Sequence, residues 1–268
     1  MKSIRMVAIL FLALLAAACV FAGRFAPASY AEQFRDLPDA SCTRTHPLGT
    51  DDLGRDRLAR LLYGTRVSLI LAPTAALLAT FLAGLIGAAA GFFGGRFESC
   101  VMAITDLVLA MPWFFLLITI RALMPLNVAP LTSVTITFAL LGCLGWAGAA
   151  RVVCADARTL CGSDMVLLAR ACGTGGTRLL WRHILPNLKP VLYAQFWISV
   201  PIFILTEANL GMLGLGVAEP LPSWGSLLRE LESYSAGSSQ PWVFAPLILL
   251  IITVSCFQLA VRKEEIRA

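Results

Sequence analysis

Apolar residues along this chain occur in long runs, not in the alternation expected of half-buried β-strands. Each run holds 18 residues or more, close to the ~20 that an α-helix needs to cross a hydrocarbon core of ~30 Å. Runs of this length without alternation favour membrane-spanning helices over a β-barrel. We predict six transmembrane helices, at Met6–Gly23, Val67–Gly95, Cys100–Ile120, Thr132–Ala150, Pro190–Ala218 and Pro241–Val261.

The overall composition indicates the same class of protein. Apolar residues make up 58% of the 268 residues and charged residues 14%, against roughly 45–50% and 25% in an ordinary globular domain. The mean hydropathy is +0.80. One core cannot hide this much apolar surface from water, so lipid is the solvent for most of the chain. We interpret the net charge of +5 as membrane-orienting charge and expect no nucleic-acid partner.

The distribution of basic residues predicts the orientation. If six helices alternate across the bilayer, twelve of the 21 Lys and Arg residues lie on one side, six of them in the loop 151–189. Basic loops stay in the cytoplasm. We therefore predict cytoplasmic termini, a transmembrane anchor over 1–23, a periplasmic segment over 24–66 and a cytoplasmic tail over 262–268. An alternative for 1–23 is a cleaved signal peptide ending near Cys19.

Small residues recur every four positions in the second predicted span. Ala83, Gly87, Gly91 and Gly95 form the small-xxx-small pattern that lets two helix backbones approach closely. We expect a tightly packed helix pair here, either within one subunit or across a dimer. The alternative is that glycine is simply frequent in membrane helices.

The motifs of common enzymes are missing from the sequence. It holds no P-loop, no H-E-x-x-H, no G-x-S-x-G and no C-x-x-C, and its only histidines are His46 and His183. We predict no catalytic, cofactor-binding or metal-binding residues, and eight cysteines that act as small apolar residues. Any energy-driven role requires an outside motor, so the chain is not expected to be an enzyme.

Two carboxylates lie within otherwise apolar predicted spans. Asp106 and Glu207 would each be costly in bare lipid, so each should face a bundle interior or a water-filled path. They are candidate pathway or gate residues. The alternatives are a carboxylate held by the backbone or by a neighbouring arginine, or one close to the membrane interface.

The loop 151–189 is the strongest candidate for contact with a soluble partner. It contains six basic residues and the helix breakers Gly173–Gly176 and Pro186. The stretch 164–172 directly before these breakers predicts a short helix, with Asp164 near its start where a carboxylate is favoured. The alternative is a basic segment resting on anionic lipid headgroups.

This loop resembles the cytoplasmic motif E-A-A-x3-G-x9-I-x-L-P of the inner-membrane permeases of binding-protein-dependent ABC importers. Ala169, Gly173, Leu185 and Pro186 fall at matching positions. Leu167, Leu168 and His183 occupy the positions of the Glu, the first Ala and the Ile. Two further regions, 46–68 and 207–225, resemble the C-type permeases of the oligopeptide/dipeptide/nickel branch.

The resemblance implies an all-α bundle of the ABC importer type I permease kind, with a core over 67–261 and a cytoplasmic coupling helix. It implies import of short peptides or nickel complexes, with no cofactor in this chain. Expected partners are a second homologous permease, two ATPase subunits that carry ATP and Mg, an extracytoplasmic substrate-binding protein and the lipid bilayer of the bacterial inner membrane. The residues expected to couple to the ATPase are Leu167, Leu168, Ala169, Gly173, His183, Leu185 and Pro186.

Leu167 departs from the family pattern, because it replaces a charge that is common at the coupling surface. Rival functions are a stand-alone channel or secondary transporter, and an intramembrane hydrolase. The first would need several carboxylates deep in the spans, whereas only Asp106 and Glu207 are available. The second would need paired catalytic side chains, which the sequence does not offer.

Overall fold

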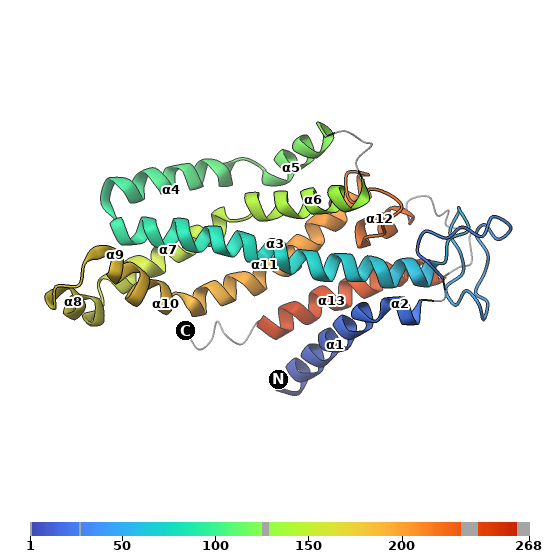
Figure 1. Ribbon diagram of the computed structural model, residues 1–268, viewed down its shortest axis with the longest axis horizontal. Helices are drawn as coiled ribbons and strands as arrows, with labels where there is room; N and C mark the ends of the chain where they lie inside the picture. Colours follow the sequence, from blue (N-terminus) through green and yellow to red (C-terminus); the bar gives the residue numbers. More distant parts are fainter. Residues whose placement is uncertain (1, 27, 125–128, 232–240, 262–268) are drawn as a thin grey trace. The chain divides into compact units, whose positions relative to one another are not determined.

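A computed structural model of the chain describes residues 2–26, 28–124, 129–231 and 241–261 (Figure 1). Within these ranges the chain is helical, and its extended pairing is limited to an isolated antiparallel bridge between Thr50 and Asp56. The predicted cytoplasmic tail, 262–268, lies outside the described residues.

The helices follow one another along the chain with short connections. The first nine are α1 (Lys2–Val20), α2 (Ala22–Phe25), α3 (Arg57–Phe93), α4 (Gly95–Ala110), α5 (Trp113–Ala122), α6 (Pro130–Leu144), α7 (Ala147–Cys161), α8 (Asp164–Ala171) and α9 (Gly176–Leu179). They are followed by the π-turn η1 (Leu180–Ile184), α10 (Leu185–Asn187), α11 (Lys189–Met212), α12 (Trp224–Arg229), the 3-10 turn η2 (Pro241–Phe244) and α13 (Ala245–Val261).

The chain divides into two compact units. Unit 1 comprises Met1–Ala72, Ile120–Phe138 and Pro201–Ala268, and unit 2 comprises Pro73–Thr119 and Ala139–Val200. The long helices α3 and α11 contribute one part to each unit.

Unit 1 contains both ends of the chain. Helix α1 packs along α13 (Figure 1), and α12 also contacts α13. Between α2 and α3, the predicted periplasmic segment forms turns that are tied together by backbone hydrogen bonds, such as that from Phe34 N–H to the Gly54 carbonyl. A polar loop of this kind satisfies its backbone groups internally where no regular element does so.

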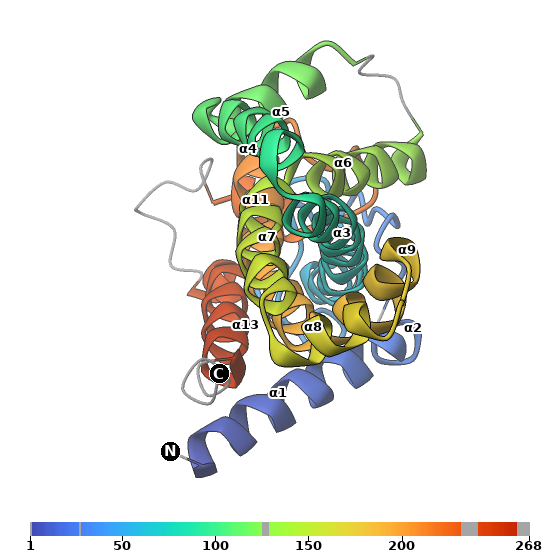
Figure 2. The same ribbon diagram turned by 90° about the vertical axis from the view of Figure 1, so that its left-hand side faces the viewer.

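Unit 2 contains the segment expected to couple to an ATPase. Helix α4 packs against α7, and α7 leads directly into α8, which contacts both α7 and α9 (Figures 1 and 2). The C-terminal part of α3 lies against α7, and Gly87 and Gly91 of the small-residue stripe make this contact. Gly95, the last predicted member of the stripe, begins α4 and takes no part, since a Cβ added there would have no neighbour within 4 Å.

The small-residue stripe forms a close helix pair within the subunit. A Cβ atom added to Gly87 would come within 2.5 Å of the Ala150 carbonyl oxygen, and one added to Gly91 within 2.5 Å of the Cys154 carbonyl oxygen. Because backbone atoms occupy the space of the missing side chains, α3 and α7 approach as closely as the small-xxx-small pattern predicts. The predicted tight helix pair is confirmed within the subunit, and it consists of α3 and α7.

Helices cover most of each of the six predicted spans, but the third passes from α4 to α5 and the fourth from α6 to α7, so neither is one continuous helix. Among the described residues, five helical segments are long and apolar enough to cross a membrane, and α4 with α5 supplies a sixth if this bent pair is a single span. The two helices meet at an angle of 70°. Pro112 lacks an N–H and disfavours the helical conformation at Met111, which is extended at φ −73°, ψ 129°.

Several helix ends differ from the predicted spans. Helix α3 begins at Arg57, ten residues before Val67, so 57–66 form its first turns instead of belonging to an irregular segment. Helix α7 continues to Cys161, through residues that we assigned to the loop 151–189. Its buried side chains recur at helical spacing, at Ala150, Val153, Cys154 and Ala157. Helix α11 ends at Met212 and leaves 213–218 as a turn.

Candidate functional site

The predicted coupling helix is present as α8. The carbonyl oxygen of Ser163 accepts hydrogen bonds from the N–H groups of Val166 and Leu167, which starts the helix. Asp164 lies in the first turn, where its carboxylate is favoured by the helix dipole. The predicted short helix over 164–172 is therefore confirmed to within one residue.

Gly173 ends this helix in the left-handed conformation, at φ +77°. The N–H of Thr174 bonds to the Ala169 carbonyl and the N–H of Gly173 to the Arg170 carbonyl. This pair of bonds is a Schellman motif, which satisfies carbonyls that the helix end leaves without partners. Glycine is favoured at this position because it has no Cβ that would clash at positive φ.

Helix α8 presents an apolar face outward as well as inward. Val166 is fully buried and Ala169 is partly buried, whereas Leu167 is 50% exposed and Leu168 is 67% exposed. Ala169 therefore packs inside the subunit, whereas Leu167 and Leu168 are the apolar motif side chains of α8 that a partner can cover.

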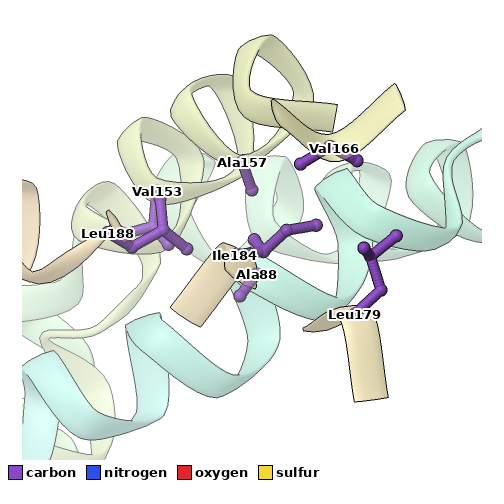
Figure 3. Close-up of a cluster of buried hydrophobic side chains, with 7 residues drawn as sticks. All are labelled: Ala88, Val153, Ala157, Val166, Leu179, Ile184 and Leu188. Atoms are coloured by element: carbon purple, nitrogen blue, oxygen red, sulfur yellow. The ribbon is translucent and has the colours of Figure 1, made fainter. Parts of the chain in front are cut away.

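A cluster of buried apolar side chains holds α8 in place (Figure 3). The cluster, named here the anchor cluster, joins side chains from α3, α7, α8, α9, η1 and the end of the loop. Its buried members are Ala88, Val153, Ala157, Val166, Leu179, Ile184 and Leu188. Burying side chains of this size contributes about 1.5–3 kcal/mol for each Val, Leu or Ile, so the segment that contains α8 is held firmly against α3 and α7.

The remaining motif residues lie on the return of the loop. Pro186 cannot donate a backbone hydrogen bond and clashes with the carbonyl four residues earlier. The preceding turn widens to a π-turn, in which the Leu185 N–H bonds to the Leu180 carbonyl. Leu185 packs on the anchor cluster, His183 is partly buried and Pro186 is exposed. These three residues shape the loop, in contrast to Leu167 and Leu168.

Exposed basic side chains occur on α8 and on the two turns that follow it, α9 and η1. Arg170, Arg178 and Arg182 are exposed, and none of them forms an ion pair with the residues that the structure describes. The nearest ion pair along α7 joins Arg158 to Glu98 of α4, with 3.3 Å between Nη1 and Oε1. The exposed surface of α8 therefore carries the apolar side chains of Leu167 and Leu168 together with the positive charge of Arg170.

Asp106, one of the two carboxylates predicted within spans, lies on α4. Its carboxylate forms an ion pair with the guanidinium of Arg151 on α7, and both side chains are about half exposed on the surface of the subunit. The structure thus joins Asp106 to a neighbouring arginine, which matches one of the alternatives considered for this residue.

Glu207, the second carboxylate, is fully buried in α11 within unit 1. Its Oε2 lies 3.4 Å from the Ser68 hydroxyl of α3. Ser68 in turn accepts from the Trp224 N–H at 3.5 Å, and the Trp224 indole donates to Thr65 at 2.9 Å. Glu207 therefore belongs to a contact that joins α3, α11 and the start of α12.

Glycines allow α12 to lie directly on the end of α11. A Cβ added to Gly211 would come within 2.3 Å of the Gly225 Cα, and one added to Gly216 within 2.6 Å of the Gly211 Cα. These close contacts require Gly211, Gly216 and Gly225, of which the last two lie in the stretches 213–216 and 222–225 that resemble the peptide-permease branch.

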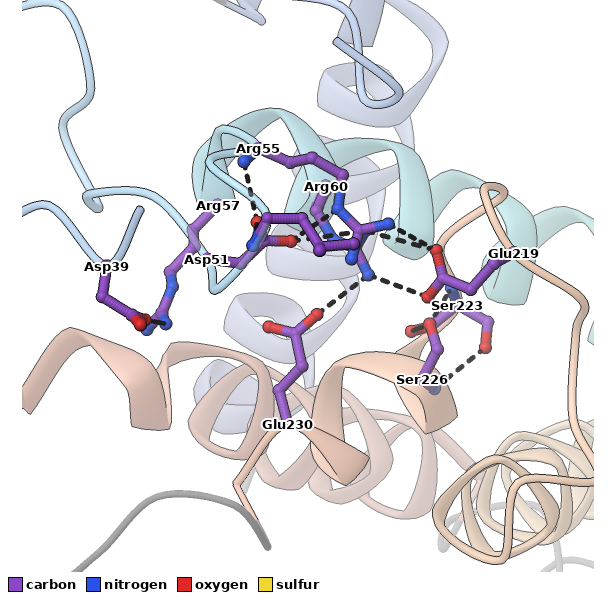
Figure 4. A network of polar contacts seen from close by, with 10 residues as sticks. Asp39, Asp51, Arg55, Arg57, Arg60, Glu219, Ser223, Ser226 and Glu230 are labelled. Carbon is purple, nitrogen blue, oxygen red and sulfur yellow. Dashed lines mark hydrogen bonds and ion pairs between the residues drawn. The ribbon is translucent and has the colours of Figure 1, made fainter. Parts of the chain in front are cut away.

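A network of charged residues gathers where α3 begins (Figure 4). Arg60 of α3 is fully buried and pairs with Asp51 at 3.5 Å, Glu219 at 3.2 Å and Glu230 at 2.8 Å. Arg55 pairs with Asp51 and Glu219, each at 2.6 Å. The Arg60 network, defined as these five residues, joins the segment before α3 to the two sides of α12.

Two carboxyl groups of the Arg60 network have pKa values that are shifted in opposite directions. Burial raises the pKa of Glu219, but the guanidinium groups of Arg60 and Arg55 outweigh it and hold that pKa below the usual range. For Glu230, burial raises the pKa to about 7, against the opposing effect of Arg60. Glu230 is therefore the member of the network that titrates near neutral pH.

The Arg60 network was not among the predicted site residues. A signal for it existed in the sequence, because Asp51, Arg55 and Arg60 lie in the stretch 46–68 that resembles the peptide permeases. Asp56 in the same stretch bonds to His46 at 2.8 Å and accepts from the Ala59 N–H at 2.7 Å, as a helix N-cap does. The partners Glu219 and Glu230 come from the other end of the sequence. Glu219 lies in the second stretch that resembles these permeases, 207–225, whereas Glu230 lies outside both stretches.

Comparison with known proteins decides the family. The family described as binding-protein-dependent transport system inner membrane component matches residues 81–262. The chain belongs to this family. It is a permease subunit of a binding-protein-dependent ABC importer, and a multi-pass protein of the inner membrane.

Relatives of this permease are named for peptide transport. It is 31% identical to the oligopeptide transport system permease protein OppC of Bacillus subtilis (strain 168), over 96% of this chain and 82% of that protein. It is 33% identical to the di/tripeptide transport system permease protein DppC of Pseudomonas aeruginosa (strain UCBPP-PA14), over 84% and 75% of the two chains.

A solved structure shares the fold of the permease. The MetNI methionine ABC transporter, in inward-facing conformations, matches with a TM-score of 0.55 and 18% identity, over 76% of this chain and 94% of that chain. The all-α fold of an ABC importer type I permease, expected from the resemblance, is confirmed.

Proposed function

We propose that this permease carries short peptides inward across the bacterial inner membrane, driven by ATP hydrolysis on separate subunits. It would pair with a second, homologous permease above two ATPase subunits that bind ATP and Mg, and an extracytoplasmic binding protein would deliver the peptide. Both termini and α8 would face the cytoplasm, because basic residues concentrate in 151–189. The peptide names of OppC and DppC favour peptides over nickel complexes as substrate.

The outward face of α8 is the observation that carries this proposal. Leu167 and Leu168 are exposed on the same helix as Arg170, which has no carboxylate partner in the described part of the chain. The complementary surface is a groove on the ATPase with an apolar floor and an acidic rim. Burying the exposed half or more of two leucines contributes roughly 1–3 kcal/mol, which corresponds to about a 5- to 150-fold change in affinity.

The anchor cluster gives α8 the means to pass on a movement. Since Val166 packs against side chains of α3 and α7, a displacement of α8 by the ATPase moves those two helices together with it. The close α3–α7 contact at Gly87 and Gly91 prevents the pair from separating. Rigid-body coupling of this kind links ATPase closure to alternating access.

The test is ATP-driven uptake by the complete complex in proteoliposomes. The permease, its partner permease, the two ATPases and the binding protein are reconstituted, and uptake of labelled trialanine and of labelled nickel is measured with and without ATP. Peptide uptake that requires both ATP and the binding protein supports the proposal. Uptake of nickel alone, or peptide uptake independent of ATP, would refute it.

A variant of the outward face separates docking from folding. Leu168→Asp should lower peptide-stimulated ATP hydrolysis at least tenfold, because the aspartate meets an acidic rim. Leu168→Met keeps the apolar contact and should retain stimulation. If both variants behave like the wild type, α8 rests on lipid and does not dock to an ATPase.

A further inference from the structure

A pocket lies beside the Arg60 network in unit 1. Its volume is about 440 Å³, which as a sphere is about 9 Å across. An extended peptide spans ~3.3–3.6 Å per residue, so the pocket has room for two or three residues. Its charged lining consists of Asp52, Arg55, Glu219, Arg229 and Glu230.

Most of the charged lining is neutralised within the subunit. Arg55 pairs with Glu219, and Glu230 pairs with the buried Arg60. Arg229 and Asp52 are different, because both are exposed and neither forms an ion pair with any residue that the structure describes. One cation and one carboxylate in the same pocket are therefore available to a ligand.

On one side of the pocket the guanidinium of Arg229 lies against a glycine-rich backbone segment. Gly211, Gly214 and Gly216 line this wall, and a Cβ added to Gly214 would come within 2.9 Å of the Arg229 Nη1. Arg121 fixes the wall from behind, since its guanidinium donates to the carbonyls of Leu215 and Gly216. The guanidinium of Arg229 thus lies against a constrained loop without a side chain between them.

We propose that this pocket binds a short peptide through its free termini, with Arg229 holding the C-terminal carboxylate and Asp52 the N-terminal ammonium. The inference rests on the proposed function, which supplies the orientation that makes the pocket extracytoplasmic and the peptide as cargo. The pocket is then a site in the permease itself, where a peptide released by the binding protein is held before translocation.

The mixture of charges favours a zwitterion over other ligands. Three carboxylates line the pocket with two arginines, so a phosphate or another polyanion meets repulsion there. An apolar ligand would displace water from the charged side chains of the pocket without offering them hydrogen bonds in return, which is unfavourable. A peptide with a free ammonium and a free carboxylate matches both available groups through charge-assisted hydrogen bonds.

The experiment measures binding of trialanine and its blocked forms to the full-length permease, purified with its partner subunits in lipid nanodiscs and without binding protein. Trialanine should bind at least tenfold more tightly than its C-terminal amide and than its N-acetyl form. In Arg229→Gln the preference over the amide should disappear while the preference over the acetylated form remains. In Asp52→Asn the reverse should hold.

Matched controls use charged residues of the polar segment between α2 and α3 that lie outside the pocket. Arg44→Gln and Asp36→Asn, both at exposed residues, should leave all three affinities unchanged. Loss of the two preferences in these controls as well would show a general charge effect and overturn the proposal.

Two other outcomes also overturn the inference. One is the absence of saturable trialanine binding up to 10-fold above the concentration that saturates transport. The other is that Arg229→Gln and Asp52→Asn weaken attachment of peptide-free binding protein but leave the peptide preferences intact, which would make the pocket a protein-docking surface. Peptide-stimulated ATP hydrolysis is measured in parallel. If the wild type shows no such stimulation, the proposed function is refuted. If the wild type shows stimulation but the pocket does not bind trialanine, only the present inference is refuted.

Discussion

The α3–α7 contact can be tested by adding a single methyl group to Gly91. In Gly91→Ala the new Cβ would lie 2.5 Å from the Cys154 carbonyl oxygen and 2.8 Å from the Ala157 Cβ. A carbon and a carbonyl oxygen in contact are ordinarily ~3.3–3.6 Å apart, so one of the two backbones must move by about 1 Å. Such overpacking costs typically 1–3 kcal/mol.

Gly148→Ala is the matched control, since Gly148 lies within α7 and an added Cβ would have no neighbour within 4 Å. Replacing glycine by alanine inside a helix gains about 1 kcal/mol in either position. The control should therefore be stabilised by about 1 kcal/mol, and Gly91→Ala should fall below it by the overpacking cost of about 1–3 kcal/mol.

The assay is the apparent Tm of the purified complex at one fixed scan rate, measured with both variants. At ~2–4 °C per kcal/mol for a chain of this size, Gly91→Ala should melt about 2–12 °C below Gly148→Ala. Gly91→Leu should disrupt assembly more than Leu85→Ala, because Leu85 is partly exposed. Equal Tm values for Gly91→Ala and Gly148→Ala would refute the reasoning that backbone atoms fill the space beside Gly91.

Three further predictions concern coupling, topology and pH. Gly173→Val should abolish peptide-stimulated ATP hydrolysis, because valine is strained at φ +77°. The control Gly175→Val should retain it, since Gly175 has φ −62° and an added Cβ would have no neighbour within 4 Å. In intact cells an impermeant maleimide should modify the exposed Cys42, and Cys172 only after permeabilisation; labelling of Cys172 from outside would contradict the orientation. The folded-state pKa of Glu230 is raised to about 7. Its contribution to stability is therefore present below pH ~4.5 and is lost as the pH rises through 7. Glu230→Gln should flatten the fall in Tm between pH 5 and 8, because the amide does not titrate. An unchanged pH profile in that variant would show that another group titrates there.

Apolar run length predicts the membrane-spanning helices because lipid leaves the backbone few alternatives. Helix α8 was predictable for a local reason, since Asp164 and Gly173 mark its two ends. The bend between α4 and α5 was not, because an apolar run containing Pro112 is consistent with both a kinked and a broken helix. Arg151 and Arg158 made the second half of α7 look like a loop, although its small residues recur at helical spacing.

The charged network illustrates what local sequence cannot supply. Arg60 and Glu219 are separated by 159 positions, and nothing near either residue indicates the other. Arginine at the start of a span predicts a charge at the membrane surface and not a fully buried side chain with three carboxylate partners. Likewise, the sequence predicts that residues 164–186 form the coupling motif, but only packing separates the outward Leu167 and Leu168 from the inward Ala169.

The anchor cluster limits how the coupling loop can be exchanged between permeases. A transplanted loop would bring Val166, Leu179, Ile184 and Leu188 with it but would leave Ala88, Val153 and Ala157 behind in the recipient. Where the recipient has larger or smaller side chains at those three positions, the transplanted helix would sit at a different height and angle. If α8 docks to the ATPase as proposed, a chimaera that is meant to change ATPase specificity has to carry the facing turns of α3 and α7 as well, because these turns hold α8 in position.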